Sequence, residues 1–134
     1  MAALGGLGLW LSACSGIDLD DRAGLSCIDD SPHCVARREA TLKSMLADKD
    51  RRWVREAPTP QAHATGVRLF AFRSRKGELS CDELILGRKE AETAPKALKG
   101  QQGLSPAQIS RASLFAGEVG KELAAEIRKR RCRA

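Results

Sequence analysis

Apolar residues recur at helical spacing along most of the chain after residue 30, and the last run is the clearest. From residue 106 to about residue 131, apolar positions follow one another at steps of three or four: Ile109, Ala112, Ala116, Val119, Leu123 and Ile127. This spacing puts them on one side of a helix, with charged residues on the other. The pattern therefore predicts a long amphipathic helix that buries one face.

Capping residues mark where the helices begin. Ser31-Pro32, Thr59-Pro60 and Ser105-Pro106 each put a hydroxyl side chain before a proline, which suits the first helical turn. Ser80 and Glu83 have the spacing of a capping box, in which each side chain accepts a hydrogen bond from the other residue's amide. These signals predict four helices.

The same pattern sets the expected helix boundaries. The first helix is expected over 32–54, and the third over 81–93, because Pro95 lacks the backbone donor that a continuing helix needs. In residues 66–77, Val67, Leu69 and Ala71 alternate with the residues between them, a spacing that also fits a strand. Helix is the favoured interpretation. The prediction is an all-α fold, a small antiparallel bundle of about four helices with short loops.

The first 13 residues carry no charged side chain, and a span this short is typical of a secretory signal rather than a membrane helix, which needs about 20 apolar residues. It ends in Leu11-Ser12-Ala13-Cys14, which resembles the lipobox of bacterial lipoproteins. The resemblance implies a signal peptide over 1–13, an acylated Cys14, a tether over 14–30 and a helical domain over 31–134. The alternative is a buried apolar helix with a free cysteine, which its glycines disfavour.

The chain has five cysteines, an odd number that an exported protein does not usually leave unpaired. If Cys14 carries a lipid, four remain for two disulfides, with three possible pairings: Cys27, Cys34, Cys81 and Cys132. An alternating bundle would bring all four thiols to one end. A metal or thiol-redox site at Cys27, His33 and Cys34 is the alternative, although structural zinc ligands usually come in closer pairs.

The net charge is +6, and basic residues crowd the C-terminus: Arg128, Lys129, Arg130, Arg131 and Arg133. Basic groups there complement the helix dipole, and they also suit contact with anionic lipid headgroups. A pI near 9.4 first suggests nucleic-acid binding. The basic residues lack interleaved aromatics, and the signal segment places the protein outside the cytoplasm, so no nucleic-acid partner is expected.

No catalytic triad, phosphate-binding loop or metalloprotease motif can be placed on the chain. We therefore expect a non-catalytic lipoprotein of the bacterial envelope that faces the periplasm, with no cofactor, metal or small-molecule substrate. It would act as an interaction or structural module with an envelope protein partner. The lipoprotein resemblance also implies the outer membrane rather than the inner, because Ser15, the residue after Cys14, is not acidic.

The chain is also similar in general form to small helical envelope lipoproteins, a likeness that implies no activity. Two alternative functions stay open at this point. One is a periplasmic thiol-redox or metal-binding protein that uses Cys27, His33 and Cys34. The other is a basic nucleic-acid-binding protein, which requires that the N-terminal segment is not a signal.

Overall fold

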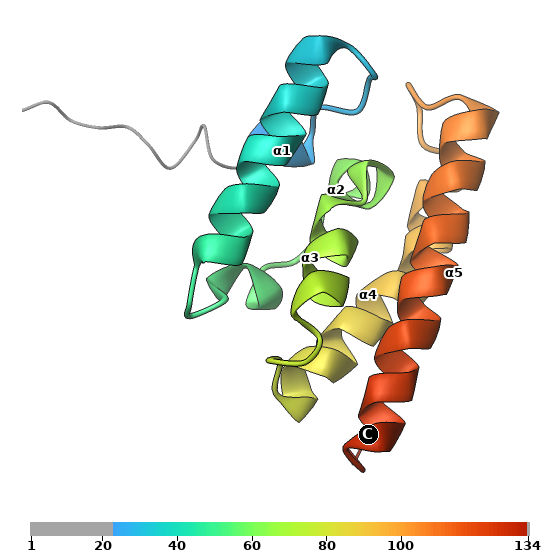
Figure 1. The fold of residues 1–134 in the computed structure, drawn as a ribbon. Coiled ribbons are helices and arrows are strands. Elements are labelled where there is room, and N and C mark those ends of the chain that lie inside the picture. The colour runs from blue at the N-terminus through green and yellow to red at the C-terminus, as the bar shows by residue number, and fades with distance from the viewer. Residues whose placement is uncertain (1–22, 134) are drawn as a thin grey trace, which may run out of the picture.

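The structure, a computed structural model, describes residues 23–133 and is built from helices. Over this range it contains no strand, which confirms the predicted all-α class. Figure 1 shows the arrangement of the helices. They are, in chain order, the short 3-10 turn η1 (Ala23–Leu25), α1 (Pro32–Ala47), the 3-10 turn η2 (Arg52–Arg55), α2 (Pro60–Thr65), α3 (Val67–Arg75), α4 (Cys81–Leu98) and α5 (Pro106–Lys129).

The predicted helix starts are all confirmed. At each one the capping hydroxyl accepts a hydrogen bond from the amide three residues later. The capping box of Ser80 and Glu83 is present, with donor–acceptor distances of 2.9 and 3.2 Å. Ser105 and Gln108 form a second capping box that was not predicted. Local sequence therefore sets where these helices begin.

The first helix is shorter than predicted, because α1 ends at Ala47 rather than at residue 54. Asp48 takes an extended conformation, and its carboxylate accepts hydrogen bonds from the amides of Asp50 and Arg52. A side chain that bonds the following amides favours a turn over a helix. Trp53, which the longer predicted helix would have buried, is still buried, because η2 directs its side chain into the core.

The predicted third helix, α4 in the structure, is longer than predicted, because it runs through Pro95 and ends at Leu98 rather than at residue 93. The missing proline donor is offset by burial, since Ala94 and Leu98 are fully buried beyond the predicted end. Ala91 also packs closely against α5: a Cβ placed on Gly120 would lie 3.4 Å from the Cβ of Ala91. Tertiary packing against α5 thus outweighs the local cost of the proline.

Residues 66–77 are helical as favoured, but the predicted second helix is divided into α2 and α3. Gly66 separates them with a φ of +69°, a left-handed conformation that glycine adopts without strain. A Cβ at this position would also come within 3.2 Å of the Phe115 ring. The glycine therefore creates the break and lets α5 approach it.

The helices do not alternate in direction as predicted. In Figure 1, α1 and the α2–α3 segment run the same way, while α4 runs back and α5 returns. The reason is the segment of residues 48–59 between α1 and α2, which contains η2 and carries the chain back toward the end where α1 began. The start of α4 therefore lies at the opposite end of the molecule from the start of α1.

The core lies where α3, α4 and α5 meet. Phe72, Leu84 and Leu123 are fully buried there, and Trp53 packs edge-on against Phe72 with ring centroids 4.8 Å apart. Gly87 allows this close approach, because a Cβ would fall 2.6 Å from the Phe72 ring. Two of the few aromatic side chains, Trp53 and Phe72, therefore form the centre of the core.

A buried ion pair crosses this core. The Arg68 guanidinium donates to both carboxylate oxygens of Glu90 at 2.7 to 3.1 Å, and the two side chains are only 2% and 6% exposed. It also donates to the backbone carbonyls of Trp53 and Glu56 at 2.7 and 2.9 Å. These bonds tie α3, α4 and the segment after α1 together and leave the buried charges compensated.

Candidate interaction surface at the basic end of the bundle

The predicted lipidation site and cleavage motif, Leu11, Ser12, Ala13 and Cys14, lie outside the described residues. The first described residues lie against α1, where the Gly24 amide donates to Thr41 Oγ1 at 3.1 Å. A Cβ on Gly24 would be 2.4 Å from that hydroxyl. The chain therefore joins the helical domain beside the middle of α1.

The two predicted disulfides are present, and the structure determines their pairing. Cys27 pairs with Cys34 across a separation of 7 residues, and Cys81 pairs with Cys132 across 51. They lie at opposite ends of the molecule, so the prediction that all four thiols meet at one end is wrong (Figure 1). The cause is the parallel course of α1 and α3. Closing the longer of the two loops is worth about 4 kcal/mol in the chain-entropy model.

The alternative site at Cys27, His33 and Cys34 takes a different form in the structure. Both sulfurs are joined to each other, so neither is a free thiolate for a metal, and His33 is exposed on the first turn of α1. Among residues 23–133, no three His, Cys, Asp or Glu side chains are grouped to hold a metal ion. The disulfide instead joins the loop before α1 to the first turn of that helix.

The end of α5 is built as a Schellman motif. The Arg131 amide donates to the Arg128 carbonyl and the Cys132 amide to the Ile127 carbonyl, at 3.1 and 3.0 Å. Arg131 has a φ of +55°, the left-handed position usually occupied by glycine in this motif. Cys132 follows directly and is bonded to Cys81 at the start of α4. The last described residues are therefore held to the bundle.

One of the five predicted contact residues points inward. The Arg130 guanidinium donates to the carbonyls of Leu79 and Lys76, the latter at 2.5 Å, and to the Glu126 carboxylate at 2.8 Å. These bonds fasten the end of α5 to the turn between α3 and α4. The spacing of Glu126 and Arg130, four residues apart on one helix, is a sequence signal for their ion pair, but no sequence pattern marks the bonds to Leu79 and Lys76.

The other four basic residues remain exposed: Arg128, Lys129, Arg131 and Arg133. None of them forms an ion pair or a side-chain hydrogen bond with any described residue. The nearby carboxylates are engaged elsewhere, since Glu126 binds Arg130 and Glu122 lies 3.5 Å from Lys76. We call these four residues the basic end.

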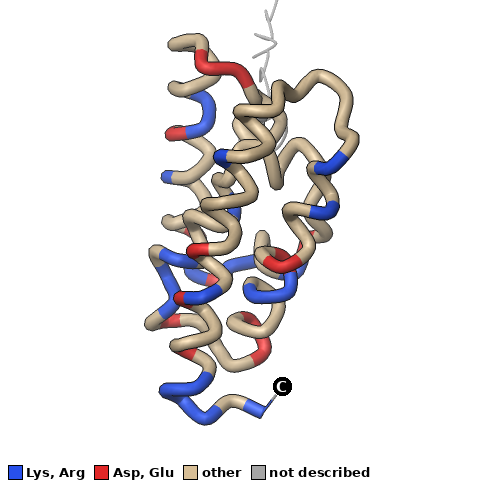
Figure 2. The backbone as a smooth tube through the Cα atoms, turned by 90° about the vertical axis from the view of Figure 1, so that its right-hand side faces the viewer, with Lys and Arg blue, Asp and Glu red and all other residues tan. Residues whose placement is uncertain are grey.

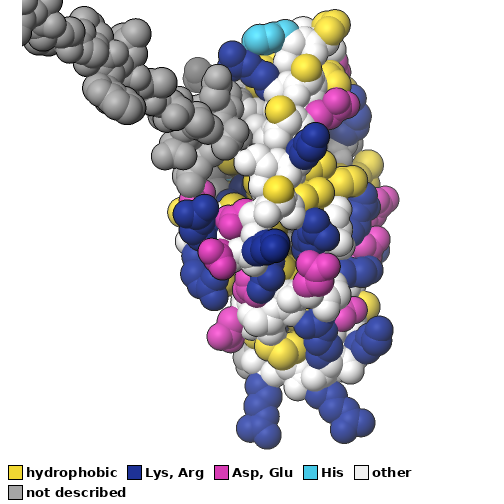
Figure 3. Space-filling model, turned by 60° about the vertical axis from the view of Figure 1, so that its left-hand side comes forward, with side chains coloured by type: hydrophobic (Ala, Val, Ile, Leu, Met, Phe, Trp, Pro, Cys, Tyr) yellow, Lys and Arg dark blue, Asp and Glu magenta, His cyan; other side chains and the backbone are white. Residues whose placement is uncertain are grey.

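In Figure 2 much of the backbone at the C-terminal tip of the bundle is coloured as Lys or Arg, and Figure 3 shows basic side chains gathered at the same end. In the space-filling view, basic side chains project beyond the body of the molecule there. Acidic side chains are interspersed with basic ones higher on the same face. The basic end is therefore a local excess of positive charge on a surface that is otherwise mixed.

A second ion pair stabilises the start of α4, to which the end of α5 is bonded by the Cys81–Cys132 disulfide. Arg51 binds Glu83 with two hydrogen bonds of 2.9 Å, and the Glu83 carboxylate also accepts from the Ser80 amide. These contacts, the Arg51 guanidinium first, lower the pKa of Glu83 to about 2. The first turn of α4, which carries Cys81, is thereby fixed to the turn that follows α1.

No described helix is both long enough and apolar enough to cross a membrane. Comparisons with known proteins give no relative from which a role could be transferred. No protein family, no curated protein and no solved structure matches the chain.

Proposed function

We propose that this protein is a non-catalytic, lipid-anchored interaction module of the bacterial envelope that contacts anionic lipid headgroups through its basic end. The proposal rests on one observation: exposed, unpaired basic side chains lie on a part of the chain that is held firmly to the bundle. Four cationic side chains stand exposed on a helix terminus that a disulfide and the Arg130 contacts hold in place. Cations on such a support reach a surface together at little ordering cost.

The strength of this contact suits an auxiliary role. Each Lys or Arg near an anionic membrane surface contributes about 1 kcal/mol, so the basic end contributes about 4 kcal/mol. One membrane signal of this size gives reversible attachment, and a lipid together with a basic patch gives stable attachment. The proposed acyl group on Cys14 would supply the other signal.

The proposed anchor can reach far enough for both contacts to form. Residues 14–22 span at most ~30 Å when extended. The 24 residues of α5 measure ~36 Å, and the described chain begins beside the middle of α1 rather than at the far end. The bundle can therefore lie with its basic end against the membrane that holds the lipid.

The anchor is tested by intact mass spectrometry of the full-length protein extracted from bacterial membranes. The expected mass lacks residues 1–13 and gains the mass of a lipid, and the Cys14→Ala variant shows neither change. Unprocessed wild-type protein that starts at Met1 would refute the anchor. This result says nothing about the basic end, which needs its own experiment.

The headgroup contact is tested by co-sedimentation with vesicles, using the chain from Ser15 onward so that no lipid is attached. Replacing Arg128, Lys129, Arg131 and Arg133 with Gln should lower binding to anionic vesicles on the order of 100-fold or more. The control replaces four exposed basic residues elsewhere with Gln: Arg37, Lys43, Lys96 and Lys99. Equal loss in both variants would mean that only net charge matters, and the proposed site would be rejected.

A further inference from the structure

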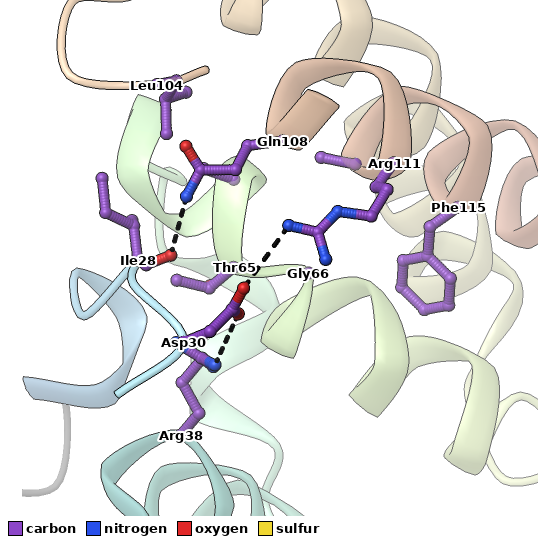
Figure 4. A pocket seen from close by; sticks show the side chains of 11 residues that line it. Ile28, Asp30, Arg38, Thr65, Gly66, Leu104, Gln108, Arg111 and Phe115 are labelled. Atoms are coloured by element: carbon purple, nitrogen blue, oxygen red, sulfur yellow. Dashed lines mark hydrogen bonds and ion pairs between the residues drawn. The ribbon is translucent and has the colours of Figure 1, made fainter. Parts of the chain in front are cut away.

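A small hollow lies at the other end of the bundle from the basic end, where the loop of residues 27–31 faces the beginning of α5. Its volume is about 210 Å³, and its walls come from this loop, the end of α2 and the first turns of α5. Figure 4 shows three charged side chains on one side of it, and Phe115 on another. We call this space the upper hollow.

The charged side of the upper hollow is a carboxylate between two guanidinium groups. Asp30 lies 3.8 Å from Arg38 and 3.6 Å from Arg111, measured between the nearest oxygen and nitrogen atoms (Figure 4). Both distances are longer than a charge-assisted hydrogen bond. The Asp30 side chain is also 71% exposed. The carboxylate is therefore held weakly and can move aside.

Arg38, by contrast, does not depend on Asp30 for its position. Its Nη1 donates to the carbonyls of Cys27 and Asp29 at 2.6 Å each, which leaves Nη2 directed to Asp30. The loop that offers these carbonyls is closed by the Cys27–Cys34 disulfide. Gln108 also ties this loop to α5 by donating to the Ile28 carbonyl at 3.3 Å. The guanidinium is thus preorganised to bind an anion.

The opposite side of the upper hollow is apolar and fixed. Phe115 lies against Gly66, and the Arg73 guanidinium lies 4.9 Å from the centroid of its ring. The other apolar residues of the lining are Ile28, Ala64, Leu104 and Ala112. The space is large enough for one side chain of moderate size.

We propose that the upper hollow binds the C-terminal residue of a peptide, with its carboxylate taking the place of Asp30 between Arg38 and Arg111 and its side chain lying on Phe115. Two guanidinium groups and one carboxylate leave one positive charge, which matches a monoanion better than a phosphate dianion. A bound carboxylate beside an apolar side chain satisfies both sides of the hollow. This site is separate from the basic end and does not depend on it.

The test uses the full chain with its disulfides intact and N-acetyl-L-leucine as the probe, followed by NMR titration. The acid should bind with shifts at the Gly66 and Phe115 amides, and N-acetyl-L-leucinamide, which lacks the charge, should bind at least about 10-fold more weakly. Acetate, which lacks the apolar body, should also bind more weakly. Equal affinity for acid and amide, or tighter binding of inorganic phosphate, would overturn the proposal.

Two exposed substitutions test the geometry. Asp30→Asn removes the internal competitor and should tighten binding about five-fold, the value of two exposed ion pairs. Arg111→Gln should weaken binding about 10-fold, and Lys99→Gln, a loss of equal charge outside the hollow, should leave it unchanged. If Asp30→Asn fails to tighten binding while the fold is intact, the carboxylate does not occupy the ligand position and the proposal is wrong.

Discussion

The two ends of the bundle are each closed by a disulfide, yet they are constructed differently. At the basic end, the Cys81–Cys132 bond joins segments 51 residues apart, and Arg130 adds two hydrogen bonds from the end of α5 to the turn between α3 and α4. At the other end, the Cys27–Cys34 bond closes only a local loop of 7 residues. The ion pairs beside it, at Asp30, are long and exposed.

The difference shows what each crosslink can do. A bond between distant segments fixes the positions of two helices relative to each other, and a local bond fixes only the shape of one loop. The basic end is therefore a rigid support for charged side chains. At the upper hollow, the disulfide fixes only the loop that carries Asp30, and the charged wall is completed by Arg38 of α1 and Arg111 of α5.

The largest expected effect comes from removing each disulfide in turn. The pair Cys81→Ala and Cys132→Ala should lower the free energy of unfolding by about 4 kcal/mol, and the pair Cys27→Ala and Cys34→Ala by about 2 kcal/mol, because the entropy of loop closure grows with loop length. Urea denaturation measures both values. If the local disulfide proves the more stabilising of the two, the contrast between the ends does not hold.

The next effect concerns the ion pairs at the two ends. Glu83→Gln should cost about 2 to 3 kcal/mol, because it leaves Arg51 without its partner in a half-buried site. Asp30→Asn, at the exposed pair, should cost less than about 0.5 kcal/mol. A similar cost for both substitutions would show that the upper hollow is held as firmly as the basic end.

The Glu83 carboxylate also predicts an acid transition. Its pKa is about 2 in the folded protein against an ordinary value of 4.5, because Arg51 and the Ser80 amide stabilise the charged form. The unfolded chain therefore binds this proton first as the pH falls. The contribution of Glu83 to stability should be complete above pH 4.5 and should disappear between pH 4.5 and about 2. The Glu83→Gln variant should lack this part of the acid profile.

Predictions from the sequence were most successful where the cause is local. The starts at Ser31, Thr59, Ser80 and Ser105 depend on one side chain and an amide three residues away, which the sequence displays directly. The number of disulfides followed from counting cysteines. Their pairing did not, because it depends on the path of the segment between α1 and α2, which no periodic pattern marks.

The failures at Pro95 and at the upper hollow have a different physical origin. The helix continues through Pro95 because Ala94 and Leu98 are buried against other elements, and this packing is not visible in the local pattern. Asp30, Arg38 and Arg111 come from three separate parts of the chain, so no motif contains them. The proposed anchor at Cys14 rests on sequence alone, since it lies outside the described residues.

A fourth prediction concerns a buried histidine in the interior of the bundle. His63 is 6% exposed, and its Nδ1 has no hydrogen-bond partner among the described residues. Burial is the main cause of its lowered pKa, with Arg68 acting in the same direction and Glu90 against it. The folded protein therefore resists protonation of this imidazole.

The sign of the resulting pH dependence follows from linkage. The unfolded chain takes up the proton near the ordinary value of 6.5 and the folded chain only at lower pH, so stability should fall as the pH drops below 6.5. The slope is at most about 1.4 kcal/mol per pH unit. His63→Gln should remove this contribution, and His33→Gln, at an exposed position, should retain it. An unchanged slope in His63→Gln would assign the dependence to another group.

The smallest effect tests the basic end itself. Arg131 occupies a left-handed conformation at φ +55°, which costs a non-glycine residue about 1 kcal/mol. Arg131→Gly should therefore raise the free energy of unfolding by about 1 kcal/mol, although it removes a charge from the anionic contact. Arg133→Gly removes the same charge and should not stabilise the protein. Both variants should bind anionic vesicles about five-fold more weakly, because each loses one positive charge. If only Arg131→Gly is more stable while both bind equally weakly, the helix-end motif determines stability and the charges determine vesicle binding.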